Sequence, residues 1–304
     1  MTKPRPDLFG VVPPVITPVD ENDRVDEPAF RAVLRRMIDV GVHGIFVAGT
    51  NGEAPLLTQS EFGRMAEIAI DEVGDRLPLL GGVMECSTAK VVERIRILRG
   101  LGYERFAVTP TFYMTLREPT EFLRLYETCA DAKGDMEMIA YNIASMTHSC
   151  PPVEVLIEAT RRGLLRTCKD TAADLAYHLK LLAAAKEVGL RVLTGNENHI
   201  KEGLKAGSVG IIPSHANYDP KVYIAAYEAS VAGDWAKVDE CMGRISYLHA
   251  NIARAGSFWC AGVKYSVACL GIGNGKPISP LEPLNAEQQA KMRAWVAEDT
   301  ARRG

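Results

Sequence analysis

The sequence has no cysteine pattern typical of a disulfide framework or a metal site. Its seven cysteines are an odd number, and no two of them form a C-x-x-C pair. This argues against a disulfide scaffold and a zinc knuckle, and it fits a reducing compartment. No apolar run reaches the roughly 18 to 20 residues of a membrane span, and Met1 to Phe9 have no apolar signal core. We therefore expect a soluble protein of the cytoplasm.

The sequence also has no excess of charge of either sign. Its 35 basic and 38 acidic residues are spread along the chain and give a net charge of -3. Such a balance provides no basic face for nucleic acid and no acidic tail. With 304 residues, of which 47% are hydrophobic, the chain can build a large core. A small molecule is therefore the expected partner.

Several motifs of cofactor and hydrolase chemistry are missing as well. The six histidines show neither H-x-H nor H-E-x-x-H spacing, and no G-x-S-x-G is present. The glycines of Gly271 to Pro277 do not fit a phosphate-binding loop, so we expect a turn there. His148 and His215 fall near expected active-site loops, although structural or solvated histidines are commoner. No metal or other cofactor is expected.

The sequence does contain a repeated rhythm of a short apolar run, a loop, an amphipathic helical segment and a glycine. The runs lack strict polar alternation, as expected of parallel strands that are covered on both faces. Helix signals lie between them, such as the capping box at Thr58 to Glu61 and the alanine-rich segment from Ala172 to Val188. Eight runs are found: Phe9 to Thr17, Gly44 to Thr50, Leu77 to Met84, Arg105 to Pro110, Glu137 to Asn142, Leu164 to Asp170, Arg191 to Asn196 and Ser208 to Pro213.

This rhythm predicts an α/β fold, a (β/α)8 TIM barrel with a C-terminal helical extension. The runs end near residue 213, and such a barrel needs ~200 to 250 residues. We expect the catalytic barrel to span residues 1–218 and the helical extension residues 219–304, with helices at Lys221 to Ala232, Trp235 to Ala255 and Asn285 to Arg302. An open doubly wound sheet is disfavoured, because the first strand-helix loop has no G-x-G-x-x-G.

The functional interpretation depends on Lys169, at the end of the sixth run. Chemistry in such barrels is built at the C-terminal ends of the strands, where Lys169 would lie near Thr50, Tyr113 and Tyr141. Burial there would disfavour the ammonium and leave a neutral amine, which can attack a keto group and form an imine. Tyr141, one strand earlier, is then placed to shuttle a proton.

Each of these residues also has an ordinary interpretation. Lys169 alone could be a solvated loop lysine with Asp170 capping the next helix, and Tyr141 could be a core aromatic with its hydroxyl at the rim. Asn51 and Gly52 form a hairpin signal, but a capped helix follows within a few residues and favours a strand-helix loop. Successive backbone N–H groups of that loop would bind a substrate carboxylate.

These motifs resemble those of the dihydrodipicolinate synthase and N-acetylneuraminate lyase family, which are class I, pyruvate-dependent aldolases. The loop Gly49 to Glu53 is similar to the family's G-[TS]-x-G-E motif, and Thr109 to Tyr113 is similar to its proline-aromatic segment. Tyr141 with Asn142 resembles its Y-N motif, and Lys169 resembles the lysine of its K-D motif. The motifs follow the family's order at successive strand ends, and the likeness covers essentially the whole chain.

The resemblance implies a role for each of these residues. Lys169 would form the Schiff base with pyruvate or a longer 2-oxo acid, and Tyr141 would shuttle protons. Thr50 and Tyr113 would relay protons, with Tyr113 reaching across a dimer interface of a homotetramer, a dimer of dimers. The amides of Thr50 and Asn51 would hold the substrate carboxylate. No cofactor is implied beyond the covalent imine on Lys169.

The resemblance also bears on the second substrate, an aldehyde. The backbone carbonyl of Ile211 would face the bound substrate. Met146 stands where dihydrodipicolinate synthases carry an arginine for the carboxylate of their aldehyde. Aspartate semialdehyde would therefore be a poor partner, unless Arg117 or Arg254 reaches the same place.

The leading hypothesis is a lyase or aldolase that cleaves 4-hydroxy-2-oxo acids or 3-deoxy-2-oxo sugar acids into pyruvate and an aldehyde. Dihydrodipicolinate synthase proper and a sugar-acid dehydratase that uses the same imine are alternatives of the same chemical class. A non-catalytic 2-oxo acid binding protein and a metal-dependent barrel enzyme are alternatives from other classes.

Overall fold

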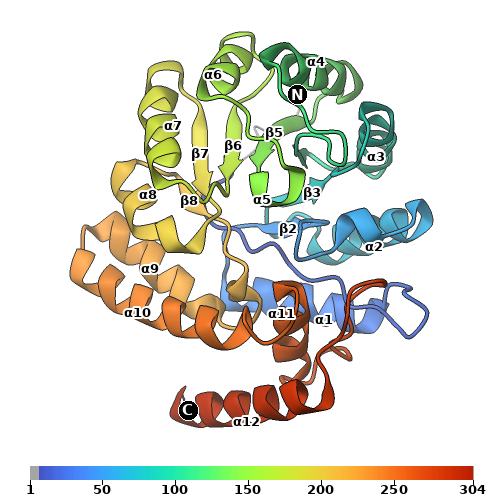
Figure 1. Cartoon of the computed structure of the whole chain (residues 1–304), viewed down its shortest axis with the longest axis vertical. Coiled ribbons are helices and arrows are strands. Elements are labelled where there is room, and N and C mark those ends of the chain that lie inside the picture. Colours follow the sequence, from blue (N-terminus) through green and yellow to red (C-terminus); the bar gives the residue numbers. More distant parts are fainter. Residues whose placement is uncertain (1–6, 304) are drawn as a thin grey trace.

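The computed structural model describes residues 7–303 and contains a barrel of eight parallel strands (Figure 1). The strands are β1 Gly10–Val11, β2 Ile45–Val47, β3 Leu79–Gly82, β4 Arg105–Val108, β5 Glu137–Asn142, β6 Thr167–Asp170, β7 Arg191–Thr194 and β8 Gly210–Ile211. They pair in the order β1-β8-β7-β6-β5-β4-β3-β2. Every strand lies within one of the predicted apolar runs, so the predicted barrel is confirmed.

The barrel closes between β1 and β2 without a regular ladder. The N–H of Val15 donates to the carbonyl of Phe46 at 2.9 Å, and the N–H of Phe46 donates to the carbonyl of Pro13 at 3.0 Å. Pro14 and Phe46 form an isolated parallel bridge. Proline has no N–H to donate, so Pro13 and Pro14 interrupt the ladder and end the regular strand early.

Most helices alternate with the strands and cover the outside of the barrel, whereas α10, α11 and α12 follow α9 with no strand between them (Figure 1). They are α1 Glu27–Val40, α2 Gln59–Val73, α3 Thr88–Gly100, α4 Pro119–Ala132, α5 Ala144–Thr147, α6 Val153–Arg161, α7 Leu175–Val188, α8 Ile200–Ala206, α9 Pro220–Ala232, α10 Trp235–Ile252, α11 Trp259–Ala268 and α12 Ala286–Arg303. Half of the predicted capping box of α2 is confirmed, since the Thr58 hydroxyl accepts from the Glu61 N–H at 3.2 Å, whereas the Glu61 carboxylate accepts from the Val25 N–H at 2.7 Å. Helix α7 begins at Leu175 rather than near Ala172, because Asp174 is its N-cap.

The C-terminal region contains a helix that the sequence did not predict. Helices α9, α10 and α12 coincide closely with the three predicted ones, whereas α11 was missed. Most residues of α11 are buried, so its sequence has no polar face to reveal a helical period. Helix α9 packs against β1 and α1 on the outside of the barrel. The predicted division of the chain after residue 218 stays a prediction.

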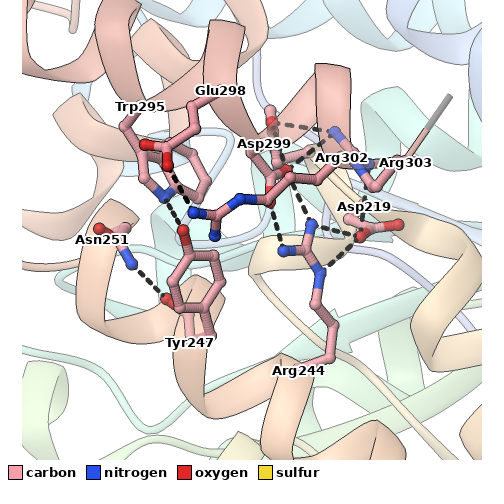
Figure 2. Close-up of polar contacts among 10 residues, drawn as sticks. Asp219, Arg244, Tyr247, Asn251, Trp295, Glu298, Asp299, Arg302 and Arg303 are labelled. Atoms are coloured by element: carbon pink, nitrogen blue, oxygen red, sulfur yellow. Dashed lines mark hydrogen bonds and ion pairs between the residues drawn. The ribbon is translucent and has the colours of Figure 1, made fainter.

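A cluster of charged residues fixes the last helix to the segment that follows β8 (Figure 2). Arg244 of α10 donates to Asp219 at 2.9 Å and to Asp299 of α12 at 2.8 Å. Arg303 pairs with the same two carboxylates, and the Tyr218 hydroxyl donates to Asp299 at 2.8 Å. The cluster therefore joins α10 and α12 to the end of the loop after β8, which contributes to the site described below.

The barrel strands bury a few ionisable side chains among many apolar ones. All four residues of β6 are buried, including Lys169 and Asp170. No helix within residues 7–303 is long and apolar enough to cross a membrane. Residues 1–6, which belong to the segment expected to lack a signal core, and residue 304 lie outside the described part of the chain.

Candidate active site

Lys169 and Tyr141 lie side by side at the C-terminal ends of β6 and β5. The two residues are register partners in the parallel ladder, and both line the same cavity. Because side chains alternate along a strand, the next pair in register, Asn142 and Asp170, points to the other face of the sheet. The register of the barrel thus brings the predicted nucleophile and the predicted proton shuttle together.

The amine of Lys169 lies among aromatic rings. Its Nζ is 3.8 Å from the centre of the Tyr141 ring and 5.0 Å from the centre of the Phe46 ring. Lys169 is only 3% exposed, and among residues 7–303 its amine has no hydrogen-bond or ion-pair partner. Burial therefore holds the pKa of Lys169 well below its ordinary value. A lowered pKa leaves more of the amine neutral and nucleophilic near neutral pH.

The hydroxyl of Tyr141 is hydrogen-bonded to Thr50, in the loop after β2. The Tyr141 Oη and the Thr50 Oγ1 are 3.2 Å apart, and either can be the donor. Burial raises the pKa of Tyr141 to about 12, although the hydrogen bond with Thr50 acts in the opposite direction. The phenol is therefore protonated near neutral pH, so it can donate a proton first and accept one later.

The loop after β2 presents free backbone N–H groups. Ala48 and Glu53 both have a φ of 53°, in the left-handed region. Gly52 has little room for a side chain, because a Cβ there would lie 3.2 Å from the backbone nitrogen of Ala48. Within the described residues, the N–H groups of Thr50 and Asn51 donate no hydrogen bond. Two adjacent free N–H groups can bind a carboxylate.

The C-terminal helices hold this loop in place. Asn51 donates through Nδ2 to the Ser214 hydroxyl at 2.8 Å and accepts through Oδ1 from the Trp259 indole at 3.1 Å. Lys264, also on α11, is ion-paired with Glu53, and both side chains are 1% exposed. Helix α11 therefore fixes the conformation of a loop that lies far from it in the sequence.

Gly195, directly after β7, packs against the nucleophile. A Cβ at this position would lie 2.9 Å from the Cε of Lys169 and 2.1 Å from the hydroxyl oxygen of Thr171. The N–H of Gly195 also donates to the carbonyl of Asp170 at 2.7 Å. A side chain at position 195 would therefore displace Lys169 or Thr171.

The cavity that Lys169 and Tyr141 line has a volume of about 630 Å³, within the range of small-molecule sites. Its floor and walls come from the ends of the strands and from the loops that follow them. The end of α10, the segment that follows it and the start of α11 contribute a further wall, formed by His249, Ala253, Arg254, Ser257 and Trp259. The C-terminal extension is thus part of the site.

Asp170, next to the nucleophile, is a buried acceptor and does not cap a helix. Its Oδ1 accepts from the Asn142 amide at 2.7 Å, and its Oδ2 lies 2.6 Å from Nδ1 of His178. The His178 Nε2 lies 3.0 Å from the Thr194 hydroxyl. This network links β5, β6, β7 and α7 around the residue that follows Lys169.

Glu197 and His215 form a buried pair in the cavity wall. Glu197 Oε2 lies 2.8 Å from His215 Nδ1, and Oε1 accepts from the His215 N–H at 2.9 Å. Burial alone would raise the pKa of Glu197, but the charge and hydrogen bonds of His215, with a hydrogen bond from Tyr223, lower it to about 2. Among the described residues the His215 Nε2 has no partner, and the ring packs edge-to-face against His249 at 5.3 Å. The ionised carboxylate thus fixes the orientation of the His215 ring.

Two predicted site residues lie outside the cavity. Tyr113 follows β4 with a φ of 74°, is 86% exposed, and does not line the cavity. Its role across an interface stays a prediction. The carbonyl of Ile211 accepts from the Val12 N–H at 2.9 Å in the barrel ladder, and its expected role toward the substrate stays a prediction. Its neighbour Ile212 lines the cavity.

The residues considered for the aldehyde lie in different places. Met146 lines a neighbouring, mostly apolar pocket together with Phe112 and Phe258, and this pocket shares Thr50 with the Lys169 cavity. Arg117 is exposed and lines neither of these two pockets. Arg254 does line the Lys169 cavity. Arg254 therefore lies at the Lys169 cavity and not in the pocket of Met146, and the expectation that aspartate semialdehyde is a poor partner stays a prediction.

The sequence predicted the central residues of the site but not most of the residues that hold them in place. Glu197 directly follows the seventh run, which was a usable signal, but its pairing with His215 depends on the fold. Trp259 and Lys264 gave no signal, because their helix was not recognised. Residues 7–303 contain no group of three His, Cys, Asp or Glu side chains that could hold a metal ion. The expectation that no metal takes part stays a prediction.

Comparison with known sequences gives matches over nearly the whole chain. The model of the dihydrodipicolinate synthetase family matches residues 7–299. An uncharacterised DapA-like lyase of Halobacterium salinarum is 31% identical over 291 residues, which cover 96% of this chain and 94% of the relative. A 4-hydroxy-tetrahydrodipicolinate synthase of Phenylobacterium zucineum is 28% identical over 291 residues, which cover 95% of this chain and 96% of the relative.

Solved structures share the fold. YagE, a prophage protein of E. coli K12 from the dihydrodipicolinic acid synthase family, was solved in complex with pyruvate. It superposes with a TM-score of 0.89 at 23% identity, covering 95% of this chain and 98% of YagE. The dihydrodipicolinate synthase of Bacteroides thetaiotaomicron superposes with a TM-score of 0.90 at 22% identity, covering 96% of this chain and 98% of that one.

Proposed function

The chain belongs to the dihydrodipicolinate synthetase family of lyases and synthases, and from this premise we propose that it cleaves or forms a carbon-carbon bond through an imine between Lys169 and a 2-oxo acid. One observation carries the proposal. The Lys169 amine is buried beside Tyr141 and has no partner among residues 7–303, in a cavity lined by Thr50 and Asn51, whose N–H groups donate to none of these residues.

The first half of the reaction forms the imine. The neutral Lys169 amine attacks C2 of the 2-oxo acid, while the carboxylate of the acid accepts hydrogen bonds from the N–H groups of Thr50 and Asn51. The resulting carbinolamine loses its hydroxyl as water, with the Tyr141 phenol supplying the proton. The products of this half are one water molecule and a protonated imine, which withdraws electrons from C3.

The second half breaks or forms the carbon-carbon bond. In cleavage of a 4-hydroxy-2-oxo acid, the deprotonated Tyr141 takes the proton of the C4 hydroxyl, and the C3–C4 electron pair moves into the imine. The aldehyde leaves, and the enamine that remains is protonated at C3 and hydrolysed to pyruvate. Thr50 is hydrogen-bonded to the Tyr141 oxygen and stabilises the phenolate between the two proton transfers.

The relatives support pyruvate as the 2-oxo acid of this reaction. YagE, which shares the fold, was solved in complex with pyruvate, and the family model spans both Tyr141 and Lys169. A non-catalytic binding protein would have no need for an unpaired amine in a buried cavity, where the desolvation of lysine is costly. We therefore favour catalysis over simple binding.

Borohydride trapping tests the proposal. The protein is incubated with pyruvate, reduced with borohydride, digested, and analysed by mass spectrometry. We expect one modified peptide, carrying a reduced pyruvate adduct on Lys169. Lys264 is the internal control, because it is equally buried but ion-paired with Glu53 and should stay unmodified. Equal labelling in a Lys169→Met variant, or none in the wild type, would disprove the imine.

A product assay separates lyase from dehydratase chemistry on the same imine. Each member of a panel of 4-hydroxy-2-oxo acids and 3-deoxy-2-oxo sugar acids is incubated with the protein, and pyruvate release is measured enzymatically. The proposal expects pyruvate and an aldehyde in equal amounts. Loss of water with retention of the carbon chain would instead identify a dehydratase.

A further inference from the structure

His178 of α7 lies buried behind the barrel wall, next to the residue that follows the nucleophile. Its side chain is 1% exposed, and its Nδ1 lies 2.6 Å from the fully buried carboxylate of Asp170. Its Nε2 lies 3.0 Å from the Thr194 hydroxyl. Asp170 and Thr194 are register partners on β6 and β7. One imidazole ring therefore spans the last pair of this ladder.

The hydrogen bonds of Ser208 decide the direction of the contact between His178 and Thr194. The Ser208 hydroxyl has one proton, and its oxygen lies 2.7 Å from the carbonyl of Gly210 and 3.0 Å from that of Val192, which can only accept. Two hydroxyl oxygens 3.0 Å apart need a proton between them, so the Thr194 hydroxyl donates to Ser208. Because Thr194 then has no second proton to offer, the Nε2 of His178 is the donor in its contact with Thr194.

The second ring nitrogen of His178 carries a proton as well. The other carboxylate oxygen of Asp170 accepts from the Asn142 amide at 2.7 Å and from the Ala172 N–H at 3.3 Å, and such hydrogen bonds favour the ionised carboxylate. Imidazole is a stronger base than a carboxylate, so the proton between the two groups lies on Nδ1 of His178. With both nitrogens protonated, His178 is an imidazolium that forms a buried ion pair with Asp170.

The groups packed against the ring agree with this charge. His199, just before α8, stacks on His178 with the ring centres 6.2 Å apart. The pKa of His199 is lowered by burial and further by the charge of His178. Helix α8 also packs against the ring, since a Cβ on Gly203 would lie 2.9 Å from the His178 Nε2. Within residues 7–303, Asp170 is the carboxylate that compensates the imidazolium.

Both partners of the imidazolium are adjacent in the chain to residues that position the nucleophile. Asp170 directly follows Lys169, and its hydrogen bond with Asn142 ties β6 to β5. Thr194 directly precedes Gly195, which packs so closely against Lys169 that a Cβ there would lie 2.9 Å from the lysine Cε. A shift of either partner would therefore move the backbone that carries or contacts Lys169.

From this arrangement we propose that His178 is a positioning residue, an imidazolium that holds the ends of β6 and β7 so that Lys169 meets the 2-oxo acid in a reactive geometry. The inference rests on the proposed imine and adds a residue that acts through Asp170 and Thr194. Charge-assisted hydrogen bonds are shorter and stronger than neutral ones, so they suit this task. A neutral imidazole has one N–H only and would leave one of its two partners without a donor.

Nitrogen NMR of the wild-type protein tests the charge. The ring nitrogens of the histidines are isotope-labelled, and solid-state spectra are recorded near neutral pH. The His178 signals are assigned by their absence in His178→Gln or, if that variant does not fold, by their persistence in glutamine variants of the other five histidines. We expect two protonated ring nitrogens in the wild type and one bare nitrogen in Asp170→Asn. A bare nitrogen on His178 in the wild type would overturn the inference.

Borohydride trapping with pyruvate tests the effect on the nucleophile. The trapping rate is measured over a range of pyruvate concentrations in the wild type, His178→Gln and His199→Gln. His199→Gln is the matched control, because His199 stacks on His178, whereas its side chain is hydrogen-bonded to neither Asp170 nor Thr194 within the described residues.

We expect His178→Gln to lower the saturating trapping rate roughly tenfold to a hundredfold, the range for a reacting group displaced by about 1 Å. The half-saturating pyruvate concentration should change little, because the loop after β2, which is proposed to hold the carboxylate, is not altered. A general loss of structure would change both values. His199→Gln should leave both unchanged.

The same measurements separate the failure of this inference from that of the proposed function. Trapping in the wild type with an equal saturating rate in His178→Gln, or with an equal loss in His199→Gln, would reject only the positioning role of His178. No trapping on Lys169 in the wild type would reject the imine and, with it, this role.

Discussion

Tyr141 and Lys169 are register partners on adjacent strands, and the Lys169 amine lies 3.8 Å from the centre of the Tyr141 ring. The pairing fixes the nucleophile against the aromatic face and leaves the phenolic oxygen hydrogen-bonded to Thr50. The ring and the hydroxyl of Tyr141 therefore have separable functions. The ring contributes to the apolar environment that lowers the pKa of Lys169, and the hydroxyl transfers protons.

Replacing Tyr141 with phenylalanine separates these two functions. Tyr141→Phe keeps the ring beside Lys169, so borohydride trapping with pyruvate should still label Lys169. Turnover should fall by about 10²- to 10⁴-fold, the usual contribution of a positioned acid-base group. Steady-state rates and trapping yields on the same preparation give both quantities. A variant that turns over at the wild-type rate would assign the proton transfer to another group.

The lowered pKa of Lys169 predicts the pH dependence of imine formation. An ordinary lysine is mostly protonated below its pKa of about 10.4, so its reactivity rises steeply toward alkaline pH. Burial lowers the pKa of Lys169, so its amine is neutral at pH values at which an ordinary lysine is protonated. It should lose reactivity only when the pH falls below this lowered pKa. The rate of pyruvate trapping, measured from mildly acidic to alkaline pH, should therefore reach a plateau early. A rate that rises throughout the alkaline range would indicate an unshifted lysine.

Gly195→Ala should impair the nucleophile without removing a functional group. The added Cβ would lie 2.1 Å from the Thr171 hydroxyl oxygen and 2.9 Å from the Lys169 Cε, so these side chains must shift beside Tyr141. A displacement of about 1 Å can cost on the order of 10²-fold in rate. The measurement is the rate of pyruvate trapping. Gly63→Ala is the control, because a Cβ at this position of α2 meets nothing within 4 Å.

Glu197 should contribute to stability in a defined pH range. Its pKa falls from 4.5 to about 2 in the folded protein, so its contribution is present above pH 4.5 and is lost as the pH falls toward 2. A shift of this size corresponds to ~3 kcal/mol of unfolding free energy. The difference in unfolding free energy between the wild type and Glu197→Gln, measured by denaturant titration, should become smaller as the pH falls through this range. A constant difference would show that the carboxylate is not stabilised by His215.

The sequence predicted the barrel and its central residues for the same reason. In a parallel barrel each strand is a short buried run, so the end of a run marks the mouth of the barrel, and Thr50, Tyr141 and Lys169 could be placed there. Arg254, after α10, and Trp259, at the start of α11, could not be placed in this way. They reach the cavity through the docking of helices, and no strand marks the ends of these helices. The burial of α11 on most sides also removed the periodicity that reveals a surface helix.

The sequence did not predict the buried polar pairs of the site either. Glu197 and His215 are separated by 18 positions and belong to different strand-helix loops, so only the closed barrel brings them together. Ile211 and Ile212 show a further limit of prediction from the sequence. Adjacent residues at a strand end differ in which carbonyl is used by the ladder, and an apolar pattern does not distinguish them.

The buried pair of Lys264 and Glu53 predicts a stability effect that originates in the C-terminal extension. Lys264→Met would leave the Glu53 carboxylate buried without its partner, and breaking such a pair costs about 3 to 5 kcal/mol. Changing Glu53 to Gln in the same protein removes the unpaired charge, so the double variant should regain part of this loss. Lys180→Met is the control, since its pair with Glu154 is exposed at the surface and should contribute less than about 1 kcal/mol. The free energies of unfolding of the wild type, Lys264→Met, the double variant and Lys180→Met are measured by denaturant titration. If Lys264→Met lost no more stability than Lys180→Met, Glu53 would have to be neutral when buried.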